Sequence, residues 1–184
     1  SVRIFGKDLH SHRTAILGRI GAIIEKPDFY PYLTGVENLR LLSRWYGLEP
    51  DAKKIEEMLD RVGLHGRGKD PVAAYSHGMK QRLGLAQAMM HDPELYILDE
   101  PTTGLDPKGI IELRELILDL KRVHNKTVIL SSHILSEIEL IADDMVIIDR
   151  GKAMVQGPVR QLLSDQDLSV VIECNTPVRV QGIV

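Results

Sequence analysis

The chain has 184 residues, 43% of them hydrophobic and 27% charged, with a formal net charge of -3 at pH 7. This size fits one globular domain with a core, and the slightly acidic balance gives no general attraction to nucleic acid or anionic lipid. Cys174 is the single cysteine, which excludes an internal disulfide and favours a reducing compartment. No apolar run approaches the roughly 18 residues of a membrane-spanning helix, so any membrane role is expected to be peripheral.

The sequence at both ends predicts elements that the chain does not complete. Val2, Ile4 and Phe5 lead directly into a turn, as though a strand had been entered midway. At the other end, residues 168–173 and 178–184 are typical of strands, and the last has no closing element. We therefore expect that further chain flanks both ends.

Between the ends, strand and helix patterns alternate. Residues 19–25 form a short apolar run with the length of a buried strand. Residues 55–62 carry apolar side chains at helical spacing, with Asp51 as the expected N-cap and Gly63 just past the C-terminus.

Asp106 and Pro107 open another predicted helix, with a cap followed by proline at the first helical position. The remaining predicted elements are strands at 95–98, 127–131 and 145–149 and a helix at 135–141. Alternation of this kind predicts an α/β fold with a parallel sheet covered on both faces.

Two adjacent carboxylates, Asp99 and Glu100, follow the apolar strand 95–98. Ligands gather at the carboxyl ends of parallel strands, and neighbouring side chains on a strand point in different directions. One carboxylate can therefore support Mg²⁺ while the other polarises a water molecule. A polar turn that merely closes the strand is the alternative, and these residues alone leave it open.

Residues 75–82 (YSHGMKQR) run directly into a predicted helix. Free N–H groups and the helix dipole make such an N-terminus suitable for phosphate, and Ser76 can add a hydroxyl donor. An ordinary N-cap role for Ser76 is the more common alternative.

Three ordered motifs, YSHGMKQR, LYILDEPTTGLD and ILSSH, together resemble the ATPase subunit of ATP-binding cassette (ABC) transporters. The segment IIEKPDFYPYLTGVENL is similar to the bacitracin-export type. The resemblance implies a P-loop NTPase (RecA-like) parallel sheet with an inserted α-helical subdomain. It divides the chain into residues 1–25, a helical subdomain 26–91, a core 92–165 and the start of a C-terminal extension at 166–184.

The resemblance also assigns residue roles. Ser76 and Gly78 match the signature loop, which in such ATPases contacts the γ-phosphate held by the opposite subunit. Asp99 matches the Walker B aspartate that supports Mg²⁺, through water. Glu100 matches the catalytic glutamate that polarises the attacking water.

Three further positions match the family's motifs. Asp106 corresponds to the loop aspartate that faces the partner subunit, and His133 to the switch histidine that reaches the γ-phosphate. Glu25 takes the place of a glutamine that couples the nucleotide site to the membrane partner, and it is a second candidate ligand for Mg²⁺. The signature loop departs from the family, with His77 in place of glycine and Met79 in place of glutamine.

The family places its contact with the membrane permease in the helical subdomain, where Asn38, Arg40 and Trp45 lie. The aromatic segment 29–32 is a candidate docking patch, although aromatic residues are more often part of a core.

A glycine-rich phosphate loop followed by lysine and Ser/Thr is absent from the sequence. Residues 63–70 match only its glycine and lysine spacing, since Asp70 replaces the Ser/Thr and a helix precedes them. We interpret this segment as a polar connector and expect the true loop to precede Ser1, so that the chain as it stands is inactive.

The resulting hypothesis is an ATP- and Mg²⁺-dependent ATPase on the cytoplasmic face of the membrane. It would form a head-to-tail dimer and drive drug or peptide-antibiotic export through a separate permease, with no nucleic-acid partner. A DNA-maintenance ATPase and a non-catalytic interaction fragment are the alternatives.

Overall fold

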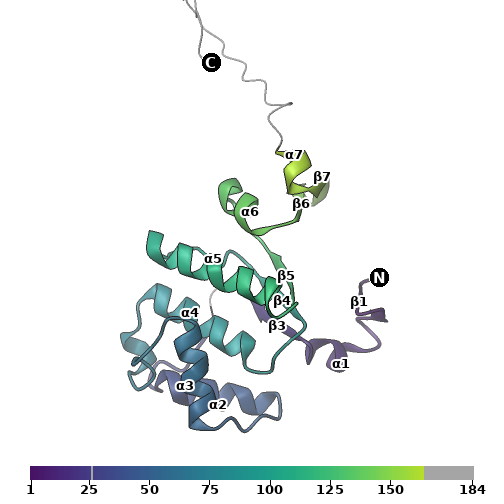
Figure 1. The fold of residues 1–184 in the computed structure, drawn as a ribbon. Helices are drawn as coiled ribbons and strands as arrows, with labels where there is room; N and C mark the ends of the chain where they lie inside the picture. The colour runs from purple at the N-terminus through teal and green to yellow at the C-terminus, as the bar shows by residue number, and fades with distance from the viewer. Residues whose placement is uncertain (26, 164–184) are drawn as a thin grey trace, which may run out of the picture. The chain divides into compact units, whose positions relative to one another are not determined.

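The computed structural model describes residues 1–25 and 27–163 (Figure 1). The strands predicted at 168–173 and 178–184 lie outside the described residues. The chain divides into two units, Ser1–Glu137 and Ile138–Val184. The subdomain boundaries expected at 25, 91 and 165 stay predictions.

The first unit is built on a parallel sheet of three strands, in the order β3 (Ile20–Ile23), β4 (Leu95–Leu98) and β5 (Thr127–Leu130). Its pairing is regular, with Ala22 beside Ile97 and Ile97 beside Ile129. The three strands predicted from the sequence therefore form the parallel sheet, with their carboxyl ends at one edge.

One face of the sheet is covered by helices α4 (His77–Met89) and α5 (Pro107–Arg122), which pack on β3 and β5 respectively. Tyr96 and Leu98 on this face are each 1% exposed, and burial raises the pKa of Tyr96 to about 12. Gly21 permits the close approach, because a Cβ there would overlap the carbonyl oxygen of Ala88.

The opposite face is covered only in part by the described residues. Ile20 and Leu95 pack there with Ile16 of helix α1 (Arg13–Leu17). Further along the strands, Ala22 and Ile129 are exposed. The prediction of a sheet covered on both faces thus holds for the α4 and α5 side and fails at these two positions.

Three helices, α2 (Gly35–Trp45), α3 (Ala52–Arg61) and α4, pack on one another beside the sheet. Each begins at a side chain that accepts a hydrogen bond from a backbone N–H group of its first turn: Thr34, Asp51 and Ser76.

The end of α3 is closed by a Schellman motif. The N–H of Leu64 donates to the carbonyl of Leu59 at 2.8 Å, and that of Gly63 donates to Asp60 at 3.0 Å. Gly63 has φ +73°, which glycine adopts without strain. The predicted cap residues Asp51 and Gly63 are both confirmed.

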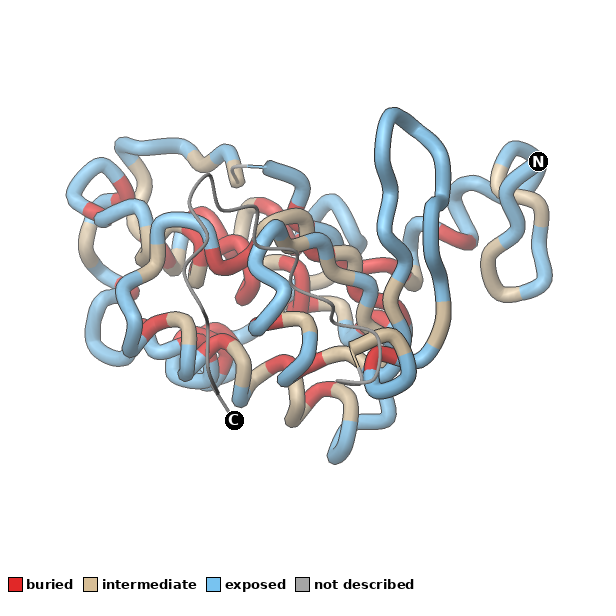
Figure 2. The backbone as a smooth tube through the Cα atoms, turned by 90° about the horizontal axis from the view of Figure 1, so that it is seen from above, coloured by how far each residue is buried: buried red, intermediate tan, exposed pale blue. Residues whose placement is uncertain are grey.

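Short elements complete the described chain. The strands β1 (Arg3–Ile4) and β2 (Lys7–Asp8) pair at the N-terminus, and a 3₁₀ turn spans Val72–Ala74. The helix predicted at 135–141 is present as α6 (Leu135–Ile141). Most buried positions, red in Figure 2, belong to the first unit.

The second unit contains an antiparallel hairpin of β6 (Asp144–Asp149) and β7 (Lys152–Pro158), followed by α7 (Val159–Leu162). A strand was predicted at 145–149, but as a further parallel strand, and that pairing is wrong. Arg150 and Gly151 form a two-residue loop with φ +47° and +76°. Such a loop is the turn that joins antiparallel neighbours, so the chain folds back here.

Candidate functional site

The carboxylates Asp99 and Glu100 lie at the carboxyl edge of the parallel sheet. The N–H of Asp99 donates to the carbonyl of Ile23 at 2.8 Å, and that of Ser131 donates to Leu98 at 3.0 Å. These bonds continue the pairing of the three strands by one residue and bring Asp99 and Ser131 to neighbouring positions.

Ser131 links the two carboxylate residues. Its hydroxyl donates to Oδ1 of Asp99 at 2.5 Å and accepts from the backbone N–H of Glu100 at 2.8 Å. Hydrogen bonds that involve a charged group are shorter and stronger than neutral ones, so Asp99 is held in one orientation. Ser131 was not among the residues predicted for the site, although its place directly after a strand parallel to 95–98 is a signal that could have revealed it.

Glu100 and His133 are in direct contact. Nδ1 of His133 lies 2.8 Å from Oε2 of Glu100, and the hydroxyl of Thr103 donates to the same oxygen at 3.3 Å. Because an ionised carboxylate only accepts, Nδ1 carries the hydrogen in this pair. The Glu100 side chain is 34% exposed and that of His133 is 71% exposed, so both are open to solvent.

Glu100 adopts a left-handed backbone conformation, with φ +46°. A non-glycine residue in this region is strained, and such strain gathers at functional sites when the surrounding structure holds it. Here the Ser131 hydroxyl accepts from the Glu100 N–H and so helps to fix the peptide that turns the side chain toward His133.

The candidate residues Ser76 and Asp106 each begin a helix. The Ser76 hydroxyl accepts from the N–H of Met79 at 3.2 Å and retains its own hydrogen for donation. Oδ1 of Asp106 accepts from the N–H of Gly109 at 3.0 Å, and Pro107 stands at the first helical position as predicted. The N-cap interpretation of Ser76 is therefore confirmed.

The first residues of α4 contact the loop before α5. A Cβ added at Gly78 would lie 3.1 Å from the Leu105 side chain. A Cβ at Gly104 would overlap the ring of His77, which therefore occupies the space beside this glycine. Residues 76–78 at the start of α4, called the Ser76 loop below, thus lie against residues 104–106 before α5, called the Asp106 loop. Together they form a second group that contains Ser76, Gly78 and Asp106.

Glu25 follows β3 by two residues, on the same edge of the sheet as Asp99, and is exposed. Its φ of +56° is also left-handed. No group of three or more acidic, histidine or cysteine side chains gathers to hold a metal ion within residues 1–25 and 27–163. Asp99, oriented by Ser131, fits the one-carboxylate mode in which Mg²⁺ takes its other ligands from water and phosphate.

The lysine-containing segment 63–70 is a connector, as interpreted from the sequence. It begins at the C-terminus of α3 and leads to the 3₁₀ turn at Val72, and its Lys69 side chain is exposed. Only the short 3₁₀ turn follows it directly, and the next α-helix begins at His77, so the strand–loop–helix arrangement that cradles phosphate is absent from this segment.

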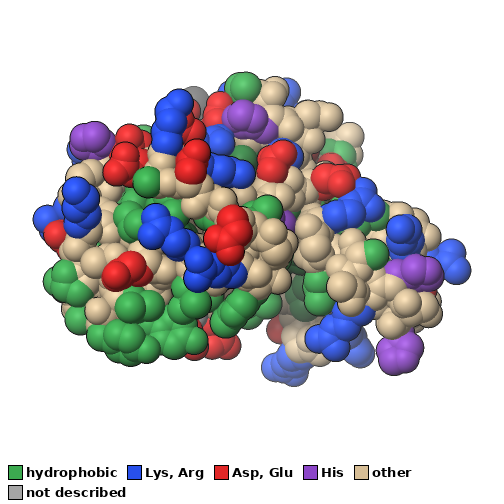
Figure 3. Space-filling model, turned by 90° about the horizontal axis from the view of Figure 1, so that it is seen from below, with side chains coloured by type: hydrophobic (Ala, Val, Ile, Leu, Met, Phe, Trp, Pro, Cys, Tyr) green, Lys and Arg blue, Asp and Glu red, His purple; other side chains and the backbone are tan. Residues whose placement is uncertain are grey.

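A groove of about 480 Å³ lies between the end of β3 and helices α2 and α4, lined by Ile24, Phe29, Tyr30 and Trp45 among others. Trp45 is 71% exposed and Tyr32, next to the groove residues in sequence, is 74% exposed. The core interpretation of the aromatic segment is therefore wrong for Tyr30 and Tyr32. Figure 3 shows hydrophobic side chains gathered along one edge of the face that it views.

Asn38, in contrast, is inaccessible. It is 0% exposed, its amide donates to the carbonyls of Tyr30, Leu33 and Thr34, and its Oδ1 accepts from the N–H of Tyr30 at 2.9 Å. Asn38 thus holds the aromatic segment, and within the subdomain that the resemblance assigns to permease contact it presents no surface of its own.

A parallel sheet with paired carboxylates at its carboxyl edge, beside a serine-capped helix, is an arrangement typical of nucleotide-binding α/β domains. The chain belongs to the ABC transporter family, whose sequence model matches residues 1–103.

The chain is 45% identical to the bacitracin transport ATP-binding protein BcrA of Bacillus licheniformis over 93% of its length. It is 43% identical to BcrA of Enterococcus faecalis over 88%. These matches cover 59% and 52% of the two relatives, so the chain spans little more than half of their length.

Solved structures agree with the family. The structure of an ATP-binding subunit of an ABC transporter superposes with a TM-score of 0.75 at 31% identity, over 88% of this chain and 68% of that one. The ATP-binding cassette MJ0796, bound to ADP and phosphate, gives the same score at 22% identity and shows the shared fold. No helix in the described part of the chain has the length and apolar character needed to cross a bilayer.

Proposed function

We propose that this chain is part of an ATP-hydrolysing subunit that powers export of a drug or peptide antibiotic through a separate permease. The observation that carries the proposal is the linked set of Asp99, Ser131, Glu100 and His133 at one edge of the parallel sheet. Its geometry provides an oriented carboxylate for a cation and a second carboxylate that is fixed by a histidine.

In this proposal the Glu100 carboxylate accepts a hydrogen bond from the attacking water and so orients and polarises it. The side chain is one-third exposed, which leaves it accessible to that water. His133 holds Glu100 through Nδ1, which leaves its exposed Nε2 available to the γ-phosphate. Asp99 would hold Mg²⁺ through water, with Glu25 as a further candidate ligand. Bound Mg²⁺ would neutralise charge that develops on the phosphates.

Ser76 and Gly78 are proposed to contact the γ-phosphate bound by a second copy in a head-to-tail dimer, with Asp106 facing that copy. Free N–H groups at the start of α4 and the unused hydroxyl hydrogen of Ser76 supply donors of the type that bind phosphate. The groove beside Trp45 is proposed to receive the permease, which would place the subunit on the cytoplasmic face of the membrane.

The first test is titration calorimetry of MgATP into this chain and into a chain extended upstream by about 50 residues, a length that the family resemblance suggests and that is compatible with one domain. We expect saturable binding by the longer chain and none by the present one. Saturable binding by the present chain would show that another segment holds the phosphates and would overturn the site assignment.

The second test is the variant Glu100→Gln in the longer chain. We expect hydrolysis to fall about 100-fold, as for loss of a general base, while MgATP binding is retained. Glu115→Gln, an exposed glutamate on α5, is the matched control and should hydrolyse at the wild-type rate. Equal rates for wild type and Glu100→Gln would contradict the role of Glu100.

A further inference from the structure

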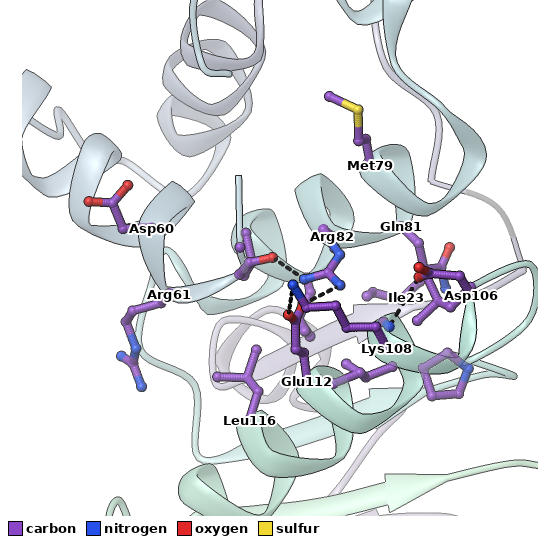
Figure 4. Close-up of a pocket in the computed structure, with 17 residues that line it drawn as sticks. Ile23, Asp60, Arg61, Met79, Gln81, Arg82, Asp106, Lys108, Glu112 and Leu116 are labelled. Carbon is purple, nitrogen blue, oxygen red and sulfur yellow. Dashed lines mark hydrogen bonds and ion pairs between the residues drawn. The ribbon is translucent and has the colours of Figure 1, made fainter. Parts of the chain in front are cut away.

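Arg82 joins three helices through one guanidinium group. It lies on α4, six residues after Ser76, and its side chain is 19% exposed. Its Nη1 donates to the carbonyl of Val62 at 3.0 Å, and its Nη2 donates to Oε2 of Glu112 on α5 at 2.7 Å. Figure 4 shows Arg82 and Glu112 pointing toward one another at the edge of a cavity of about 450 Å³ between α3, α4 and α5.

Both groups that accept from Arg82, the Val62 carbonyl and the Glu112 carboxylate, are favourable neighbours for a positive charge. Val62 is the C-cap of α3, and the last carbonyls of a helix lack partners within the helix and carry the negative end of its dipole. Glu112 is an anion that also lies 3.6 Å from Lys108. A planar guanidinium can donate in two directions at once, whereas the compact ammonium of lysine cannot span the same two acceptors.

Two glycines leave the space that the guanidinium occupies. A Cβ at Gly63 would overlap Nη1 of Arg82, and a Cβ at Gly109 would lie 3.2 Å from Nη2. Gly109 is also the residue whose N–H donates to Asp106. Arg82 therefore sits directly against the first turn of α5, the turn that fixes Asp106.

We propose that Arg82 is a positioning residue that sets the distance between the Ser76 loop and the Asp106 loop. The two loops touch through Gly78 and Leu105, and Arg82 braces the helices behind them. The inference rests on the proposed function, in which these loops face the nucleotide of a second copy. Arg82 itself contacts neither group and acts through the orientation of α4 and α5.

The test uses Arg82→Lys and Glu112→Gln, singly and together, with Arg61→Lys as the matched control. Arg61 also links α3 to α5, through Asp119 at 3.5 Å, but does not reach α4. In the longer, hydrolysing chain we expect kcat to fall about tenfold in either single variant, with KM for MgATP within twofold. The double variant should lose no more than the single ones, because both remove the same interaction.

Hydrogen exchange of the present chain, without nucleotide, provides an independent readout. We expect the amides of residues 76–79 and 104–109 to exchange about tenfold faster in Arg82→Lys and at the wild-type rate in Arg61→Lys. Unchanged exchange, or equal effects of the two variants, would overturn the inference. The two proposals can fail separately. If the longer chain does not hydrolyse ATP while these exchange rates change as expected, the proposed function is refuted and the positioning role of Arg82 is still supported.

Discussion

At the residue scale, His77 shows how this chain accommodates a departure from the family's signature loop. Its ring occupies the space beside Gly104, whose φ is +77°. Glycine at 104 therefore serves two purposes, since it avoids backbone strain and leaves room for the ring. A side chain at position 104 would strain the backbone and overlap the His77 ring, and so would disturb the contact between the two loops.

The variant Gly104→Ala is expected to destabilise the chain by about 2 kcal/mol or more, from the left-handed backbone and from overlap with His77. Urea unfolding measures the loss. Gly66→Ala is the control, because Gly66 has φ +69° with nothing within 4 Å, and it should cost only about 1 kcal/mol. If adding His77→Ala to Gly104→Ala recovers nothing, the proposed overlap is not the cause.

His91 is a second residue whose environment makes a measurable prediction. Its Nε2 donates to the carbonyl of Ile20 at 3.0 Å, its ring stacks on Tyr46 at 4.1 Å, and its Nδ1 is buried without a partner among the described residues. Burial lowers the pKa of His91 below its usual 6.5, against smaller opposing effects of the Ile20 carbonyl and Asp92. Protonation would place a charged N–H where nothing accepts it.

A histidine whose folded pKa is depressed stabilises the fold fully above its unfolded pKa and loses that contribution as pH falls. We expect the free energy of unfolding to decrease as pH falls below about 6.5 toward the lower folded pKa. The variant His91→Gln keeps a donor for Ile20 and cannot titrate, so its stability should depend less on pH in this range. Parallel curves for the two proteins, measured by urea unfolding, would refute the prediction.

At the element scale, the N-cap of α5 combines a stabilising hydrogen bond with a candidate functional role. Asp106 caps α5 through the N–H of Gly109, and the same carboxylate is the candidate that faces a second subunit. Asparagine caps helices as well as aspartate does, but it lacks the charge. The two roles can therefore be separated by substitution.

We expect Asp106→Ala to lower the free energy of unfolding by about 1 kcal/mol and Asp106→Asn to leave it nearly unchanged. Thermal unfolding of this chain measures both. Asp51→Ala, at the cap of α3, is the control and should cost a similar amount without any effect on hydrolysis in the longer chain. Equal stability of Asp106→Ala and wild type would show that the cap contributes nothing.

Local signals predicted the elements well because caps and apolar spacing act within a few residues. Asp51, Gly63 and Pro107 stand where the sequence placed them. The β6–β7 hairpin was not predicted, since strand alternation alone does not reveal that Arg150 and Gly151 both take positive φ. Ser131 was missed because its partners, Asp99 and Glu100, are more than 30 positions away and only the sheet brings them close.

At the scale of the whole molecule, net charge decides which polymers the chain attracts. With 23 basic and 26 acidic residues, it lacks the excess of cations that neutralises phosphates and releases counterions. The predicted absence of a nucleic-acid partner therefore rests on the composition and stays a prediction.

We expect no retardation of duplex DNA in a gel assay at about 50 mM salt, where electrostatic binding is strongest, and none at higher salt. A basic DNA-binding domain run in parallel shows that the assay detects weak complexes. Binding that weakens steeply as salt increases would support the DNA-maintenance alternative and contradict the transport proposal.

The complete burial of Asn38 affects how experiments that search for partners will read this region. Its four hydrogen bonds hold the segment that presents Tyr30 and Tyr32, yet the side chain is wholly enclosed. If the groove beside Trp45 receives a permease as proposed, a genetic selection for lost binding would recover changes at position 38, while a mutational scan restricted to surface residues would never include it. Footprinting would report no protection there either, so genetics and footprinting would disagree about where the interface lies.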